Sequence, residues 1–276
     1  MIPLSDSGGA PSHTTPWVTI SFIAVNAVAF LYTVFLDPQD SQIFLFRFGV
    51  VPLEFTQPDL FRLRVESVQE FDVTPLVPSW ATLITSMFLH GGWMHILGNM
   101  LFLWVFGDNL EHHFGRAGFI AFYLICGVLA SGAHILFNQD SLIPAVGASG
   151  AIAGVLGAYL LLFPRRRVRT LFMVGLITVM EVPAVWMLAI WAAIQIFSGI
   201  ISIGAIAPGG GVAYWAHVGG FAAGVGIVAG WRIHRREPVW QPDRYEAHTP
   251  HPSYYDDDDD DDYPSIPPGH TPRWRS

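Results

Sequence analysis

The sequence predicts an all-α membrane protein, a bundle of six transmembrane helices with a long structured loop after the first helix. Of the 276 residues, 52% are hydrophobic and only 13% are charged, and the mean hydropathy is +0.42. Soluble domains carry about 25% charged residues, so this chain is too apolar to be one. The net charge is −8, and no basic patch suggests a nucleic-acid partner. The one cysteine, Cys126, excludes an intrachain disulfide and a zinc site built from several cysteines.

Six apolar segments are the predicted membrane helices, because each is nearly free of charge over a length comparable to the hydrocarbon core of a bilayer. They cover residues 17–36, 93–110, 118–137, 149–163, 184–203 and 215–231. Pro164 ends the short fourth segment, since proline disfavours helix at the residue before it. Residues 37–79 carry scattered charges and prolines and are expected to form the long external loop.

The arginines predict which side of the membrane each end occupies. With six crossings, Arg116, "RRRVR" after the fourth helix and "RIHRR" after the sixth all lie on one side, which the positive-inside rule makes cytoplasmic. The apolar stretch at 168–182 is too short for a seventh crossing.

Both termini are then cytoplasmic in a multi-pass protein of a plasma or inner membrane. Residues 1–16 are the short N-terminus, and 17–231 are the membrane domain. Residues 232–276 are an acidic tail rich in Pro and His, with consecutive aspartates at 256–262, and are expected to be disordered.

Two polar side chains are predicted to lie at the same depth in this bundle. At about 1.5 Å per residue, Ser149 lies roughly 24 Å from the level of Arg165, and His217 about 22 Å from that of Arg232. The hydrocarbon core is about 30 Å thick, so Ser149 is expected about 6 Å below the outer surface. Small residues at four-residue spacing, Ser149, Ala153 and Gly157 on one helix and Gly220 and Gly224 on the other, predict that the two helices pack closely.

A serine beside a neutral histidine is the pairing of nucleophile and general base used in acyl transfer. In "HGGWMHILGNM", His95 and Asn99 are four residues apart, so both lie on one helical face. Together with the backbone N–H of Ser149 at a helix N-terminus, they are candidate donors to an oxyanion. Packing between helices is the alternative role for each of these polar residues.

The stretch from about residue 80 to 231 resembles the rhomboid intramembrane serine proteases. The resemblance rests on "HGGWMHILGN", "GDNLEHHFG", "GASGA" and "AHVGG". It implies an enzyme that cleaves other membrane proteins within or beside their transmembrane segments, in the lipid bilayer and without a cofactor or metal.

The resemblance also implies a role for individual residues: Ser149 as nucleophile and His217 as base, His95 and Asn99 as oxyanion donors, and His90, Glu111, Gly147 and Gly220 as structural support. Relatives often carry an aromatic residue at the position of Ala153, packed under the base. Another residue must therefore hold His217 here. The helix at 184–203, with the adjoining loop "GAIAPGGG", is the expected lateral gate.

Three other functions are open. A zinc protease would use His90, His95, His217 and Glu111, but no HExxH motif is present. A transporter would explain polar groups in the membrane, yet no inverted repeat is evident. An inactive rhomboid-like scaffold would keep the helices without the reaction. The substrate and the oligomeric state stay open.

Overall fold

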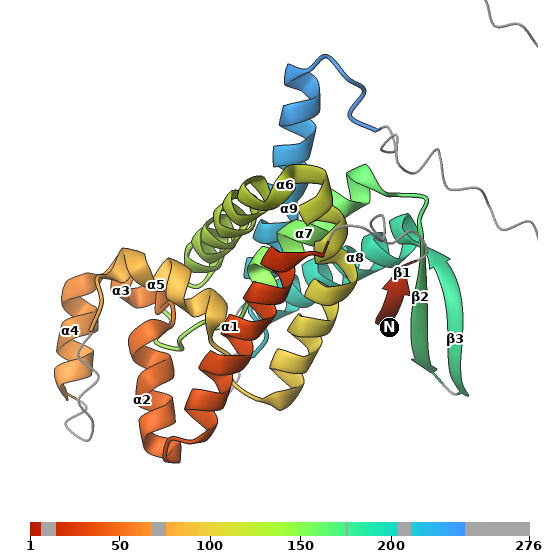
Figure 1. Cartoon of the computed structure of the whole chain (residues 1–276). Helices are drawn as coiled ribbons and strands as arrows, with labels where there is room; N and C mark the ends of the chain where they lie inside the picture. Colours follow the sequence, from red (N-terminus) through yellow and green to blue (C-terminus); the bar gives the residue numbers. More distant parts are fainter. Residues whose placement is uncertain (7–14, 68–75, 175, 204–210, 241–276) are drawn as a thin grey trace, which may run out of the picture.

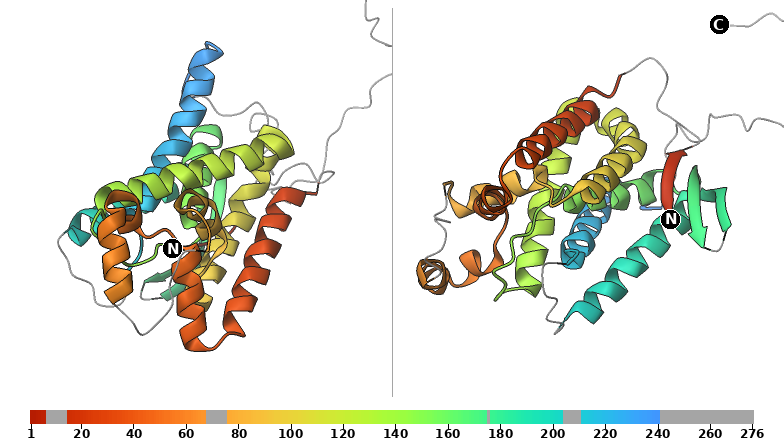
Figure 2. Two further views of the ribbon diagram at one scale, coloured as in Figure 1. Left: turned by 90° about the vertical axis from the view of Figure 1, so that its left-hand side faces the viewer. Right: turned by 90° about the horizontal axis from the view of Figure 1, so that it is seen from below.

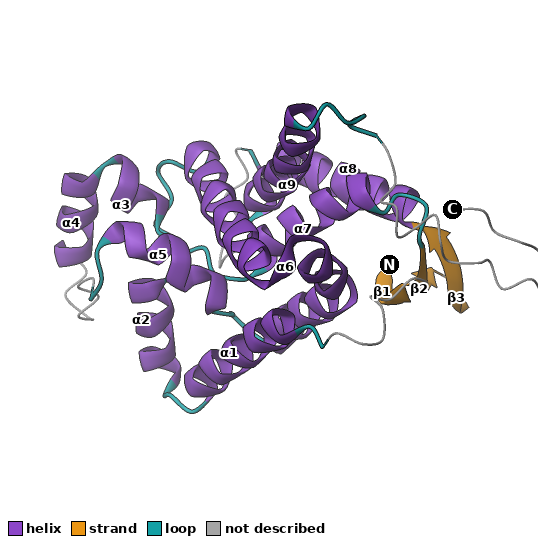
Figure 3. Ribbon diagram, turned by 45° about the horizontal axis from the view of Figure 1, so that its top comes forward, coloured by secondary structure: helices purple, strands orange, loops and turns teal. Residues whose placement is uncertain are grey.

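The protein is a helical bundle with a small sheet on one side and a group of short helices on the other (Figures 1 and 3). The computed structural model describes residues 1–6, 15–67, 76–174, 176–203 and 211–240. The tail at 241–276 and most of the loop "GAIAPGGG", residues 204–210, lie outside this description, and so do the predictions made for them. The long helices are α1 (Trp17–Val34), α6 (Trp93–Phe137), α7 (Ser149–Leu162), α8 (Ala184–Ser202) and α9 (Tyr214–His234).

The predicted second and third helices are both present, and they meet within the element α6 at Gly115, which is not helical. This residue has φ +70° and ψ 164°, a conformation that side chains disfavour and glycine adopts freely. Residues 93–110 and 118–137 were expected as separate helices with a loop between them. The structure replaces that loop by a kink, so the two arms turn sharply against each other.

Helix α7 is the centre of the bundle and packs between α6 and α9. An added Cβ on Gly220 would lie 2.0 Å from the carbonyl oxygen of Gly150, and one on Gly224 would lie 1.9 Å from that of Gly154. The predicted close packing of these two helices is confirmed. Gly157 of the predicted stripe lies in this contact, since a Cβ on it would be 2.2 Å from the Phe221 carbonyl oxygen of α9. Gly150 and Gly154, each one residue after a predicted position, add backbone carbonyl contacts.

The prediction that the fold is all-α is wrong in one part, because an antiparallel sheet joins β1 (Ile2–Asp6), β2 (Arg167–Val174) and β3 (Leu176–Pro183) in that order. The stretch 168–182 forms two of these strands in place of a seventh helix. Its Val, Ile and Thr residues favour strands, and pairing between strands satisfies its backbone groups.

Strand β1 fixes the N-terminus to the bundle. The carboxylate of Asp6 accepts hydrogen bonds from the Tyr159 hydroxyl at 2.6 Å and the Asn109 amide at 3.0 Å, and it pairs with Arg166 at 3.3 Å. Tyr159 lies ten residues beyond Ser149 on α7, about 15 Å along the helix. The sheet is therefore joined to the end of the bundle away from Ser149.

The segment between α1 and α6 is largely helical, with α2 (Pro38–Phe48), α3 (Pro52–Thr56), α4 (Pro58–Ser67), α5 (Ser79–Thr85) and the 3-10 turn η1 (Ser86–Phe88). Prolines begin α2, α3 and α4, where the missing N–H costs nothing. Val51, Leu53 and Phe61 form a small core of their own. This group lies to one side of the main bundle, as the turned views also show (Figure 2).

Three of the described helices, α1, α6 and α8, are long and apolar enough to cross a membrane. The count of six crossings stays a prediction. In it, α1, the two arms of α6, the short apolar α7, α8 and α9 each cross the membrane once.

Candidate active site

Ser149 is the first residue of α7 and is held there by the strand-like segment before it. Val50 and Ala145 form a β-bridge, and the backbone N–H of Gly147 donates to the Ser86 carbonyl at 2.9 Å. Gly147 has φ +130°, and a Cβ on it would lie 2.7 Å from Nε2 of His95. Only glycine fits this position, because any side chain would be strained and would displace His95.

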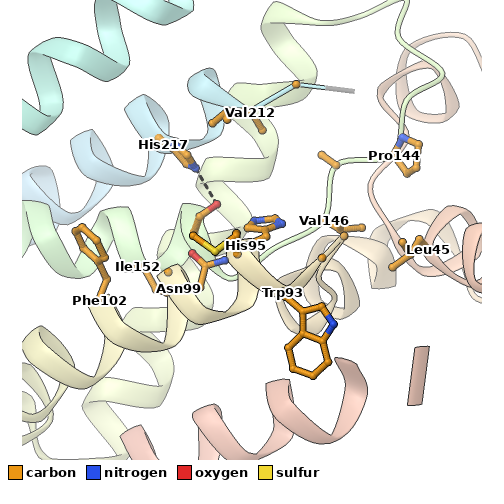
Figure 4. Close-up of a pocket in the computed structure, with 18 of the residues that line it drawn as sticks. Leu45, Trp93, His95, Asn99, Phe102, Pro144, Val146, Ile152, Val212 and His217 are labelled. Carbon is orange, nitrogen blue, oxygen red and sulfur yellow. Dashed lines mark hydrogen bonds between the residues drawn. The ribbon is translucent and has the colours of Figure 1, made fainter. Parts of the chain in front are cut away.

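Ser149 and His217 are in direct contact. Nε2 of His217 lies 2.8 Å from the Ser149 hydroxyl oxygen, and Figure 4 draws this bond as a dashed line. The contact joins α7 to α9 across 68 residues of sequence and depends on the glycine packing described above. The arrangement lets the imidazole take the hydroxyl proton.

The second ring nitrogen of His217 also has a partner. Nδ1 lies 2.8 Å from Oε1 of Gln195, which belongs to α8. The ring of Trp191, one turn earlier on α8, lies 5.9 Å from the His217 ring at 34°. Sequence reasoning required a support for His217 but did not find this one. The available signal was a lone amide in an otherwise apolar helix.

His95 and Asn99 both face the cavity beside Ser149 (Figure 4). Nδ2 of Asn99 lies 2.9 Å from Nε2 of His90, and the rings of His90 and His95 are 5.0 Å apart at 71°. Burial and, as a smaller effect, nearby His95 lower the pKa of the His90 imidazole to about 3. His90 is therefore neutral, and its Nε2 accepts a hydrogen from the Asn99 amide. The second amide hydrogen of Asn99 is left for another acceptor.

The cavity beside Ser149 and His217, called here the dyad, has a volume of about 1080 Å³. Its lining includes Trp93, His95, Asn99 and Phe102 of α6, Ser149, Ile152 and Leu156 of α7, Trp191 of α8 and His217 of α9. A separate cavity of about 30 Å³, lined by Ser131 and His134 among others, borders Ser149 as well. That size suffices for a water molecule, which needs roughly 10–15 Å³.

Glu111 takes no part in this cluster. Its carboxylate accepts hydrogen bonds from the backbone N–H groups of Val18 at 3.0 Å and Thr19 at 2.8 Å, at the start of α1. It thus satisfies N–H groups that have no partner inside the helix.

Within the described ranges, no group of three or more His, Cys, Asp or Glu side chains is placed to hold a metal ion.

Comparison with known proteins identifies the family of this chain. A family model described as the rhomboid domain matches residues 78–236. RHOMBOID-like protein 4 of Arabidopsis thaliana is 29% identical over 84% of this chain and 59% of its own length. RHOMBOID-like protein 1 of the same plant is 35% identical over 52% of this chain and 39% of its own length.

A bacterial relative, rhomboid protease GluP of Bacillus subtilis, is 41% identical over 29% of this chain and 15% of its own length. The chain thus matches only 59% or less of the length of these three relatives. The match to the rhomboid domain covers more than half of the chain. The protein is therefore a multi-pass membrane protein that belongs to the rhomboid family.

Proposed function

We propose that this protein is an intramembrane serine endopeptidase that hydrolyses peptide bonds within or next to the transmembrane segments of other proteins. The observation that carries the proposal is the distance of 2.8 Å between the Ser149 hydroxyl and Nε2 of His217, beside a cavity large enough for a peptide. Two relatives from Bacillus subtilis named as a rhomboid protease and a putative rhomboid protease add support.

In the first half of the reaction, His217 takes the proton of the Ser149 hydroxyl as the oxygen attacks the scissile carbonyl. The tetrahedral intermediate collapses when the imidazolium gives this proton to the leaving amine, so the C–N bond breaks and an acyl-serine ester remains. Water then attacks the ester with His217 again as base, and the product acid leaves. The small cavity beside Ser149 is a suitable place for that water.

The oxyanion of the intermediate is stabilised by His95, Asn99 and the backbone N–H of Ser149. His95 and Asn99 line the same cavity as the nucleophile, and the Ser149 N–H stands at a helix N-terminus, where it has no partner within the helix. His90 supports this arrangement by holding Asn99 through one of its two amide hydrogens. Because Gly147 has no side chain, the His95 ring can occupy the space beside it.

Substrate helices approach between the first arm of α6 and α8, where the cavity is lined by Phe102 and Trp191. We place Ser149 about 6 Å below the outer surface, with six crossings and both termini in the cytoplasm. The membrane domain is then 17–231, preceded by a short N-terminus at 1–16 and followed by the acidic tail at 232–276. The group of short helices α2–α5 belongs to the outer side of a plasma or inner membrane.

A fluorophosphonate probe tests the proposal directly, because it reacts with activated serines. We expect covalent labelling of the wild-type protein at Ser149 and none in the variant Ser149→Ala. An inactive scaffold, a transporter or a zinc protease would not be labelled at Ser149. Labelling elsewhere in the chain, or equal labelling of both proteins, contradicts the proposal.

A further inference from the structure

Gln195 is a polar residue in the apolar helix α8, and its amide bonds to the base of the dyad. Neighbouring side chains of this helix, such as Ile194 and Ile196, are exposed on its outer face, while Gln195 turns inward to His217. A polar amide in a membrane helix is costly unless it is hydrogen-bonded. The contact of 2.8 Å to Nδ1 of His217 meets that requirement.

The two contacts of the His217 ring together specify where its hydrogen lies. A neutral imidazole carries one hydrogen, and Nε2 must be without it to accept the proton of Ser149. The hydrogen is then on Nδ1, which requires an acceptor. The Gln195 carbonyl oxygen is that acceptor. In the other tautomer Nε2 would donate to the serine, and the ring would not act as its base.

We propose that Gln195 is a positioning residue that holds His217 in the tautomer and orientation needed for it to act as the base. This inference rests on the proposed protease function. Gln195 also continues to accept the Nδ1 hydrogen when His217 becomes an imidazolium, so the bond strengthens as the reaction proceeds.

The place of Gln195 in the fold explains why α8 has this role. The residue on α7 four positions after the nucleophile is Ala153, which has no ring to pack against His217. Trp191 and Gln195 are four residues apart and lie on one face of α8, so this helix supplies both a ring and an acceptor. The packing of α8 against α9 therefore affects how well His217 can act as the base.

Two substitutions separate hydrogen bonding from packing. Gln195→Met keeps the length of the side chain but removes the carbonyl acceptor, whereas Gln195→Glu retains an acceptor oxygen in either protonation state. Ile196→Met on the exposed face of the same helix is the matched control. The readouts are kcat and KM on a transmembrane substrate and the rate of fluorophosphonate labelling, which needs no substrate helix to enter.

We expect Gln195→Met to lower kcat and the labelling rate by roughly ten- to a hundredfold with KM unchanged, the range for losing a hydrogen bond to a charged group. Gln195→Glu should stay within a few-fold of wild type, and Ile196→Met should not differ from it. Full activity of Gln195→Met, an equal loss in Gln195→Glu, or a change in KM alone overturns the inference.

A measurement on the wild-type protein covers the case in which Gln195→Met does not fold. In ¹⁵N NMR of histidine-labelled protein, the signals of His217 are those that disappear in His217→Ala. These signals should show that the ring hydrogen is on Nδ1. A hydrogen on Nε2 overturns the inference. Equal cleavage by wild type and Ser149→Ala would instead refute the protease function. Loss of cleavage in Ser149→Ala with full activity in Gln195→Met refutes only the role of Gln195.

Discussion

The carboxylate of Glu111 on α6 caps α1 through Thr19, accepting hydrogen bonds from its backbone nitrogen at 2.8 Å and from its hydroxyl at 3.0 Å. Both residues are buried, at 5% and 0% exposure, so water cannot replace these bonds. A buried N–H left without a partner costs the full desolvation of the group. Glu111 therefore joins the kinked helix to the first helix of the bundle.

Replacing this carboxylate should lower stability and leave the chemistry intact. We expect Glu111→Gln to reduce the free energy of unfolding by about 1–3 kcal/mol, because its –NH2 group faces donors in place of an acceptor oxygen. Thermal unfolding in detergent measures the change. Glu181→Gln, on an exposed part of β3, is the control and should change stability by less than about 0.5 kcal/mol. Equal unfolding temperatures for Glu111→Gln and wild type would exclude the capping role.

Removing either member of the dyad should abolish cleavage. Ser149→Ala and His217→Ala are each expected to lose peptide-bond hydrolysis while remaining folded, and the double variant should be no slower than either, because the two residues act as a unit. Cleavage of a transmembrane substrate in detergent or liposomes is the assay. EDTA should have no effect. Wild-type cleavage by Ser149→Ala, or activity lost with EDTA and restored by zinc, contradicts the serine mechanism.

Asn99 should act on the transition state and not on substrate binding. We expect Asn99→Ala to lower kcat by about ten- to a thousandfold with KM nearly unchanged, as for loss of one oxyanion donor in soluble proteases. Steady-state kinetics on the same substrate distinguish the two parameters. Asn26→Ala is a matched control, since Asn26 is a buried amide of α1 whose Nδ2 donates to the Phe22 carbonyl of its own helix. A raised KM with unchanged kcat would make Asn99 a binding or packing residue.

Close packing of α7 and α9 should make Gly220 intolerant of any side chain. A Cβ at this position would lie 2.0 Å from the Gly150 carbonyl oxygen, so Gly220→Ala must push α9 away and with it His217. We expect a loss of about 1–3 kcal/mol in stability, typical of overpacking, and a fall in kcat. Gly226→Ala, on the same helix with open space around it, should be neutral or stabilising by up to about 1 kcal/mol. Equal behaviour of the two variants would refute the packing argument.

The depth of the nucleophile predicts where substrates are cut. If Ser149 lies about 6 Å below the outer surface, as proposed, the scissile bond should lie near the outer end of the substrate helix, where unwinding is cheapest. Glycine or proline near that bond should raise the rate, because they cost about 1 and 3 kcal/mol in helix interiors. Moving a cleavable segment stepwise along a designed transmembrane substrate, with products mapped by mass spectrometry, tests both points. Efficient cleavage at the cytoplasmic end would refute the predicted depth and topology.

The sequence alone was sufficient for the long helices and for the contact at the centre of the site. Helices α1, α7, α8 and α9 begin and end within three residues of the predicted bounds, because hydropathy and breakers such as Pro164 act locally. The contact between Ser149 and His217 followed from depth along two helices and from their small residues.

Only the tertiary structure decided the features that depend on partners distant in the chain. Strand β1 pairs with β2 across more than 160 residues of sequence, and its hydrogen bonds exist only once both segments are brought together. Gln195 contacts His217, and Asn99 contacts His90. These contacts depend on how the helices are rotated and where the loop before α6 runs, and local composition does not encode either. The apolar pattern determined which segments form the long helices, whereas the packed backbone determined which polar atoms meet between them.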